Sequence, residues 1–246
     1  MIAARDTDLA RRIAGARASR RRLHASDRPV ALDAGYAIQE QLAAGRRLNG
    51  FKLGMVSAAK QQQMGIDAPL YGRVFADMLH DAPLSLDRFM QPRLEPEVVA
   101  VVGESVPAGA DPERAIAAVA SFRLGVDVLD TVWDGYRFSP GEVVADNVAG
   151  GGFLLGPPLD DLPPTGALRL SIDGHVVAEG EIEDLGDPGR RLSWLAAHTG
   201  GLRRGHYVFM GSPAASEPAR PGELRLDGPG GEPLVAQLTS DPAQRH

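Results

Sequence analysis

From Asn49-Gly50 onward, the chain breaks into short runs of β-forming residues that are separated by glycine and proline. The 246 residues include 29 glycines and 19 prolines, and both residue types favour tight turns. This spacing predicts strands over 51–55, 72–75, 97–103, 124–130, 153–155, 167–172, 175–180, 206–211, 223–227 and 233–238. Strands this short, with turns this frequent, are typical of a rolled or sandwiched sheet.

Helical patterns come mainly before these strands. The expected helices are 6–23, 33–47 behind an Asp33 cap, 112–119 behind an Asp111 cap, and 188–198. The fold class is therefore α+β rather than alternating βαβ. We expect a helical N-terminal region (1–48) packed on a β-rich domain (49–241) that carries any active site, so that the chain is effectively one domain.

Composition excludes several classes of site. The formal net charge is −6, and lysine and arginine are scattered apart from Arg20-Arg21-Arg22, which argues against a nucleic-acid surface. No apolar stretch approaches the roughly 18 residues of a membrane span, and residues 1–6 lack the apolar core of a secretory signal. We therefore expect no membrane partner and a cytoplasmic location. Because there is no cysteine and no pair of the six histidines at metal-ligand spacing, oxygen must hold any metal.

Two glutamates, Glu95 and Glu97, precede the apolar run Val98 to Val102. Side chains alternate between the faces of a strand, so these two carboxylates point the same way. Two carboxylates at such a short distance repel each other unless a cation or a proton lies between them. Clusters of oxygen ligands suit Mg²⁺, Mn²⁺ or Ca²⁺. On spacing alone, a solvated strand edge explains the pair better than a metal site, so other residues must decide.

Three further polar residues interrupt apolar segments. Lys52 lies between apolar residues of a short strand, either as an exposed lysine or as a cation for a substrate carboxylate or for proton transfer. Asp77 ends another strand and either pairs with Lys52 or caps the following turn. Asp127 alternates with apolar residues, and a carboxylate buried there must be paired or bound to metal. We expect Asp127 to be the third metal ligand, and we expect Asp130 to form a hydrogen bond with the backbone.

The segment 143–153 reads as a strand that ends in Asp146-Asn147 and is followed by three glycines. Its glycines allow close backbone approach to an anion, although a tight structural turn is the favoured interpretation. Ser212 follows another predicted strand and is a candidate ligand contact. No serine lies in a Gly-x-Ser-x-Gly motif, so a serine hydrolase has little support.

Taken in order, these segments resemble the 2-keto-4-pentenoate hydratase and 2-oxo-3-hexenedioate decarboxylase family of the fumarylacetoacetate hydrolase superfamily. The matching segments are 34–39, 50–54, 61–72, 75–78, 91–97 with its Glu-x-Glu, 145–147, 194–196 and 205–212. The resemblance implies a mixed β-roll and metal ligands at Glu95, Glu97 and Asp127, with Mg²⁺ or Mn²⁺ as the cofactor. It also implies Lys52 and Asp77 as catalytic residues. Substrate contacts are expected at Leu53, Tyr71, Asn147 and Ser212.

The chain departs from the family pattern at four places. Asp127 stands where the family usually has glutamate, and residues 130–132 are Asp-Thr-Val in place of Asp-Ser-Arg. Val148-Ala149 replaces two serines, and Gly186-Asp187-Pro188 replaces Gly-His-Pro. These changes remove a cation and hydroxyl groups, and they raise the chance of an altered substrate or a lost activity.

The resemblance implies a lyase of aromatic catabolism that acts on a small 2-oxo or 2-hydroxydienoate acid, in a homo-oligomer. Hydration of a 2-hydroxyalka-2,4-dienoate to a 4-hydroxy-2-oxo acid is the first expectation. Decarboxylation of an acid of the 2-oxo-3-hexenedioate type is the alternative at the same site, and the sequence has features of both branches. An alternative of another class is a catalytically silent protein that binds a metabolite or a partner subunit.

Overall fold

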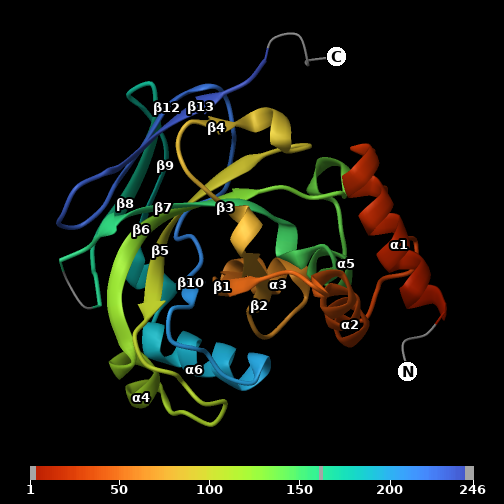
Figure 1. Ribbon diagram of the computed structural model, residues 1–246, viewed down its shortest axis with the longest axis horizontal. Coiled ribbons are helices and arrows are strands. Elements are labelled where there is room, and N and C mark those ends of the chain that lie inside the picture. The colour runs from red at the N-terminus through yellow and green to blue at the C-terminus, as the bar shows by residue number, and fades with distance from the viewer. Residues whose placement is uncertain (1–3, 161–162, 242–246) are drawn as a thin grey trace.

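The computed structural model describes residues 4–160 and 163–241, in which two curled sheets carry the strands (Figure 1). The α-helices are α1 (Ala4–Ser19), α2 (Leu32–Ala43), α3 (Ala58–Met64), α4 (Pro112–Ala117), α5 (Pro140–Ala145) and α6 (Pro188–Thr199). The first strands are β1 (Leu48–Gly54), β2 (Leu70–Phe75), β3 (Leu79–His80), β4 (Leu84–Ser85), β5 (Arg93–Val102), β6 (Val119–Leu129) and β7 (Gly150–Pro158). The later strands are β8 (Ala167–Ile172), β9 (His175–Glu181), β10 (Tyr207–Phe209), β11 (Glu217–Pro218), β12 (Gly222–Asp227) and β13 (Leu234–Thr239).

The larger sheet has the order β2-β1-β10-β5-β6-β7-β3, with β11 paired to β5. It is mixed, because β1 with β10 and β3 with β7 are parallel while its other pairs are antiparallel. The smaller sheet has the order β4-β13-β12-β8-β9, and the main apolar cluster joins residues from both sheets. The predicted α+β class with rolled or sandwiched strands is confirmed.

The long antiparallel ladder of β5 and β6 is the frame of the larger sheet. Valine is the most frequent residue of both strands, and β-branched side chains fit a pleated surface that is packed on both faces. In the register of the ladder, Glu95 lies directly opposite Asp127, and Glu97 lies opposite Gly125. Residues that face each other across a ladder share a face, so this register places three carboxylates together.

The two N-terminal helices pack against the rest of the fold. Ile13 of α1 and Ile38 of α2 join one apolar cluster with Trp133 and Ala145. The predicted Asp33 cap is wrong: α2 begins at Leu32, its N-cap position is Ala31, and no side chain caps it. Asp33 lies in the first turn instead, where its negative charge still complements the helix dipole.

The strand predicted before Asp146 is also wrong, because residues 140–145 form α5. Pro140 favours the first turn of a helix, and the Ser139 amide and hydroxyl both donate to Glu142 Oε2, at 2.7 and 2.8 Å. A run of valines there looks like a strand, but this start signal and burial on all sides make it a short helix. After α5 the chain turns through Asn147, Val148 and Ala149, all three with positive φ.

Other differences from the predicted elements are small. Helix α3 and the short strands β3, β4 and β11 were not expected, and the expected strand ends shift by a few residues. The Asp111 cap is confirmed, because its carboxylate accepts the Arg114 amide at 2.7 Å. None of the helices within 4–160 and 163–241 has the length and apolar character needed to cross a membrane.

Candidate active site

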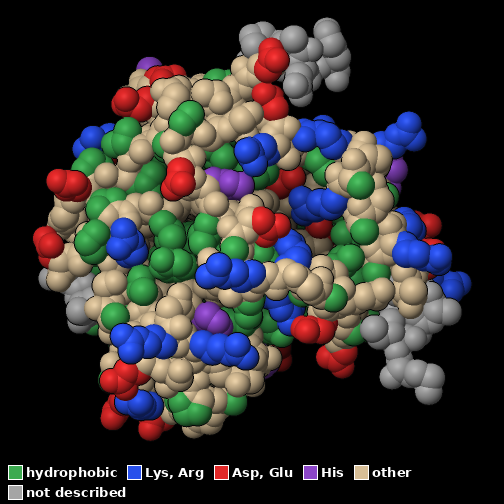
Figure 2. Space-filling view, viewed as in Figure 1, with side chains coloured by type: hydrophobic (Ala, Val, Ile, Leu, Met, Phe, Trp, Pro, Cys, Tyr) green, Lys and Arg blue, Asp and Glu red, His purple; other side chains and the backbone are tan. Residues whose placement is uncertain are grey.

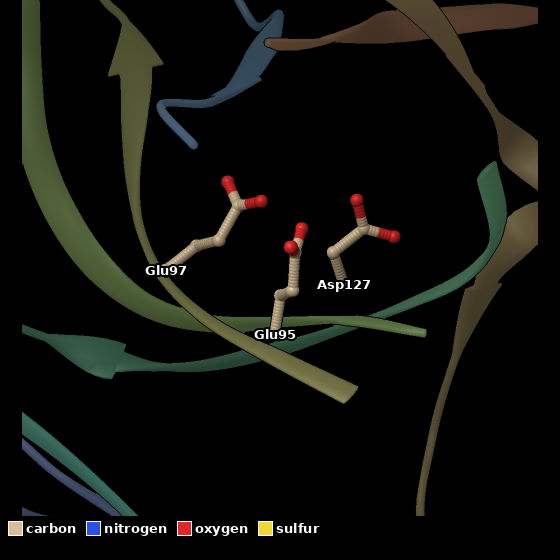
Figure 3. Close-up of side chains that lie close together, drawn as sticks. All are labelled: Glu95, Glu97 and Asp127. Carbon is tan, nitrogen blue, oxygen red and sulfur yellow. The ribbon is translucent and has the colours of Figure 1, made fainter. Parts of the chain in front are cut away.

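Glu95, Glu97 and Asp127 converge on one face of the β5–β6 ladder (Figure 3). One carboxylate oxygen from each lies within 4.8 Å of the others. Glu95 is 9% exposed, and Glu97 and Asp127 are fully buried. The three residues predicted as metal ligands therefore form a single buried cluster, which we call the acidic triad.

Lys52 of β1 is the cation closest to this triad. Its Nζ lies 2.7 Å from Asp127 Oδ2 and donates to the Val148 carbonyl at 3.1 Å. The contact with Asp127 is an ion pair rather than a directed hydrogen bond, because Oδ2 meets no donor in hydrogen-bond geometry. The unusual positive φ of Val148 turns its carbonyl to this lysine. Lys52 is thus a buried cation held between a carboxylate and a strained turn.

Glu97 and Glu95 have different surroundings. Glu97 Oε2 accepts the Gly211 amide at 2.7 Å, but no group in the described residues bonds Glu97 Oε1. Asp127 Oδ1 is likewise buried without a partner there. Glu95 Oε1 lies 3.3 Å from Nζ of Lys60, which comes from α3. Buried carboxylate oxygens are normally bonded, so the free oxygens of the triad indicate a missing ligand.

The triad carries too much negative charge for its surroundings. Burial, followed by repulsion from Asp127, raises the pKa of Glu97 well above its usual value. Burial also raises the pKa of Asp127 to about 6, against the opposing effect of Lys52. Burial alone would lower the pKa of Lys52, but attraction to the three carboxylates outweighs it and raises that pKa. A positive charge placed among the carboxylates would relieve this repulsion.

The donor set fits a hard divalent cation. All three donors are carboxylates, two of their oxygens lack any partner among the described residues, and they lie close enough to share one ion. Oxygen ligands of this kind suit Mg²⁺ and Mn²⁺. The shorter Asp127 still reaches the cluster, because the ladder register places it directly opposite Glu95.

A cavity of about 290 Å³ reaches the triad at Glu95. Lys52, Lys60 and Glu95 are its only charged lining residues within the described chain. Most of the remaining wall is apolar, from Leu53, Met55, Val56, Met64, Leu129, Tyr136, Phe138, Val143, Val148 and Ala149. The wall therefore combines a few charged groups, which contact the triad or belong to it, with a mostly apolar surface.

Two of the predicted substrate contacts line this cavity and two do not. Leu53 and Ser212 are part of its wall. Tyr71 lies outside, where its ring stacks on Tyr36 and its hydroxyl donates to the His198 carbonyl at 3.4 Å. Asn147 is also outside: its side chain accepts the Arg73 amide at 2.7 Å and donates to the Arg73 carbonyl at 2.8 Å. Asn147 holds the turn against β2 in this way, and its contact with substrate stays a prediction.

The predicted pairing of Asp77 with Lys52 is wrong as well. Asp77 is exposed, and its carboxylate accepts both of its hydrogen bonds from Arg46, at 2.8 and 3.0 Å. Lys52 pairs with Asp127 instead. Lys52 lies inside β1 with its side chain buried, whereas Asp77 lies in a short turn after β2 with its side chain toward solvent. Asp130 does bond backbone, as predicted, through the Met90 and Gln91 amides at 3.0 and 2.8 Å.

Sequence reasoning did not identify Lys60, Tyr136 or Phe138 as wall residues. Lys60 lies on a short helix with no buried residues, and its only sequence signal was a lone cation among glutamines. Tyr136 and Phe138 come from a loop between β6 and α5, and apolar wall residues look like core residues in a sequence. The placement of helix α3 and of this loop brings the three residues to the cavity.

Comparisons with known proteins identify one family model and several related enzymes. Residues 53–235 match the family described as fumarylacetoacetate (FAA) hydrolase C-terminal. A 4-oxalocrotonate decarboxylase from a Pseudomonas species is 32% identical over 195 residues, 75% of this chain and 76% of that protein. The 2-keto-4-pentenoate hydratase 2 of Dechloromonas aromatica is 32% identical over 177 residues, 67% of this chain and 68% of that protein.

Solved structures agree at the level of the fold. The 4-oxalocrotonate decarboxylase of Pseudomonas putida G7, complexed with magnesium and adipate, superposes with a TM-score of 0.84 at 24% identity. That alignment covers 96% of this chain and 97% of the decarboxylase. A fumarylpyruvate hydrolase from Pseudomonas aeruginosa with Mn²⁺ and pyruvate has a TM-score of 0.60 at 19% identity, over 78% of this chain and 89% of that one.

Proposed function

The chain belongs to the fumarylacetoacetate hydrolase C-terminal family, and we propose that it is a divalent-metal-dependent lyase that hydrates a 2-hydroxyalka-2,4-dienoate to a 4-hydroxy-2-oxo acid. The observation that carries this proposal is the buried acidic triad, whose Glu95 lines a cavity with a mostly apolar wall. Its relatives include both hydratases and a decarboxylase, so the reaction is chosen on the shape and charge of the cavity.

The residues proposed to hold Mg²⁺ or Mn²⁺ are Glu95, Glu97 and Asp127. When bound, the cation supplies a positive charge that polarises the oxygens of a 2-oxo acid and stabilises negative charge on them. The relatives' structures with Mg²⁺ and Mn²⁺ support this choice of ion.

Lys52 is the proposed proton-transfer residue. Its Nζ lines the cavity beside Asp127; burial lowers the pKa of its ammonium group, and attraction to the three carboxylates raises that pKa above its usual value. A buried ammonium beside the reacting end of the substrate is placed to donate a proton or a hydrogen bond. Asp127 and the Val148 carbonyl fix the position of Nζ. Ser212 offers a hydroxyl on the same wall, and Leu53 offers an apolar contact.

The mostly apolar wall of the cavity favours hydration over decarboxylation. A dicarboxylate substrate needs a cation for its second carboxylate, because an unpaired charge is costly to bury. Both lysines of the wall already contact carboxylates of the triad, Lys52 at Asp127 and Lys60 at Glu95. The apolar part of the wall, which includes Met55, Met64 and Phe138, suits the hydrocarbon end of a monocarboxylate.

Decarboxylation is the second candidate, because one arginine contacts two residues of the cavity wall. Arg93 donates to the hydroxyl and the carbonyl of Ser216, and its guanidinium lies 5.7 Å from the centre of the Tyr136 ring. Ser216 and Tyr136 both line the cavity, while no carboxylate of the described residues pairs with Arg93. A modest side-chain movement would let Arg93 meet a second carboxylate of the substrate.

We also propose, from family membership, that the protein works as a homo-oligomer in the cytoplasm on a small-molecule substrate. Light scattering coupled to size-exclusion chromatography tests the first part. A single species at the mass of one 26.1 kDa chain would contradict it.

The test of the reaction uses two substrates with the Mg²⁺-loaded protein. We expect loss of the dienol absorbance of 2-hydroxypenta-2,4-dienoate and no CO₂ release from 2-oxo-3-hexenedioate. CO₂ from the second substrate without hydration of the first would favour the decarboxylase. Turnover of neither, with Mg²⁺ still bound, would indicate the catalytically silent protein.

A further inference from the structure

Arg191 is a largely enclosed arginine of α6 that makes no ion pair in the described part of the chain. Its Nη1 donates to the Met210 carbonyl at 2.6 Å, and its Nη2 donates to the Gly186 carbonyl at 3.3 Å. Its Nε is buried without any partner there. Burial lowers the pKa of Arg191 to about 10, although Glu97 and Asp187 attract its charge. An arginine that bonds only carbonyls and keeps one buried N–H unbonded contributes little to the free energy of unfolding.

The Met210 carbonyl belongs to the same peptide unit as the Gly211 amide, and that amide donates to Glu97 Oε2 at 2.7 Å. In a trans peptide the C=O and the N–H point in opposite directions. Arg191 therefore holds one end of this peptide plane while Glu97 accepts from the other end. A cation on the carbonyl also polarises the peptide and strengthens the hydrogen bond from its N–H.

Steric contacts at Gly211 do not by themselves fix the orientation of this peptide. Gly211 has φ of +90°, and a side chain added there would approach Val56 to 2.7 Å. Glycine is needed for this conformation, but glycine by itself permits many others. The bond from Arg191 selects one of them.

The orientation has a consequence for the acidic triad. With Oε2 of Glu97 occupied by Gly211, Oε1 is the oxygen left without a partner. Groups that hold a metal ligand in place commonly change metal affinity by about 10–100-fold when they are removed.

We infer that Arg191 is a positioning residue, which fixes the Met210–Gly211 peptide so that Glu97 presents Oε1 to a divalent cation. The inference rests on the proposed function, in which the triad binds that cation. Arg191 itself touches neither the cation nor the substrate; it acts through the peptide and Glu97.

The experiment measures Mn²⁺ affinity by calorimetry and hydrogen exchange of the Gly211 amide in the full chain. Arg191→Met is the main variant, and Arg191→Lys keeps the charge but cannot bridge the Met210 and Gly186 carbonyls with a planar fork. Arg190→Met is the matched control, because Arg190 is the next residue of the same helix, 82% exposed, and its Nε lies 3.7 Å from Asp187 Oδ2.

We expect Arg191→Met to raise the Kd for Mn²⁺ at least about tenfold and to speed exchange of the Gly211 amide, with a smaller change of the same sign in Arg191→Lys. Arg190→Met should change both by less than about twofold. A Kd for Arg191→Met within twofold of wild type would overturn the inference. A raised Kd with unchanged Gly211 exchange would also overturn it, because the effect would not pass through the peptide.

Two other results are possible in this experiment, and each has its own criterion. If Arg191→Met does not fold, Arg191→Lys is judged by the same two criteria. If the wild-type protein binds no Mn²⁺, the proposed function fails. Gly211 exchange in the metal-free variants then decides the inference: unchanged exchange overturns it, and faster exchange supports it.

Discussion

Lys52 and Asp127 depend on each other more than on any other residues of the site. Their side chains are 2% and 0% exposed, and their charged atoms lie 2.7 Å apart. Removing one partner of a buried ion pair leaves an uncompensated charge, whereas replacing both by apolar groups is often nearly neutral for stability. The same pair also contributes one proposed ligand and the proposed proton donor.

Lys52→Met should therefore destabilise the metal-free protein by about 3–5 kcal/mol, because it leaves the buried carboxylates of the triad without this cation. Urea unfolding in EDTA measures this free energy. The double variant Lys52→Met/Asp127→Leu should recover much of the lost stability while remaining unable to bind Mg²⁺. Equal stability of the single variant and wild type would show that the pair is not formed.

The site residues differ in whether their neighbours in the sequence are enough to predict their place in the structure. Glu95, Glu97 and Asp127 could be identified because strand alternation and the cost of a buried carboxylate act within a few residues. Asp77 was misplaced because a short polar residue at a strand end looks the same whether it bonds backbone, meets an arginine or faces a cavity. Only the packing of distant segments makes that choice.

Among the secondary-structure elements, the β5–β6 ladder determines the geometry of the triad. Gly125 lies opposite Glu97 in this ladder, and a side chain at Gly125 would meet Val99 Cγ2 at 2.4 Å and Phe209 Cε1 at 2.9 Å. These contacts leave no space for a methyl group without a shift of the strand. A glycine at this position keeps β5 and β6 close and in register.

Gly125→Ala should destabilise the protein by about 1–3 kcal/mol and weaken Mg²⁺ binding, because the strain displaces the face that carries Glu97. Chemical denaturation and calorimetry give the two values. Gly109→Ala is the control, since a side chain there meets nothing within 4 Å. A Gly125→Ala variant as stable as the control would contradict this account of the ladder.

The elements themselves were predicted with uneven success. Alternating apolar runs between glycines and prolines gave most strands of both sheets, because strand period and turn chemistry are local. Helix α5 was read as a strand, since its three buried apolar residues in a row carry no period. The register that opposes Glu95 and Asp127 was beyond reach, because it depends on pairing between residues that are far apart in sequence.

In the assembled fold, the N-terminal helices are joined to the triad's sheet by a buried network around Arg17. Its guanidinium donates to Asp146 Oδ1 and Asp130 Oδ2, at 2.7 and 3.1 Å, and to the Asp130 carbonyl at 2.9 Å. Asp130 directly follows β6, which carries Asp127. We propose that residues 1–48 and 49–241 form one cooperative unit because this network and the Trp133 cluster connect them.

Arg17→Met should lower the free energy of unfolding by about 3–5 kcal/mol, because it leaves two carboxylates buried without their cation. Arg11→Met is the control, since Arg11 and its partner Asp8 are 74% and 58% exposed and their pair should contribute less than about 1 kcal/mol. Thermal and urea unfolding should each remain a single transition. Two separate transitions in wild type would contradict one cooperative unit.

Figure 2 shows acidic and basic side chains interspersed over the visible face, in keeping with a modest net charge of −6. The proposed chemistry lies inside the molecule, at the triad and its cavity, rather than on a charged surface. Divalent metal is the condition on which the proposed activity depends.

The most direct test of metal-dependent hydration is to titrate Mg²⁺ into EDTA-treated protein with 2-hydroxypenta-2,4-dienoate and to follow the dienol absorbance. We predict no decay above the uncatalysed rate without the cation, a rate that rises to saturation with Mg²⁺, and no rise in Glu97→Gln. A rate in the wild-type protein that is the same with and without Mg²⁺, or no decay at any Mg²⁺ concentration, would contradict the proposed function.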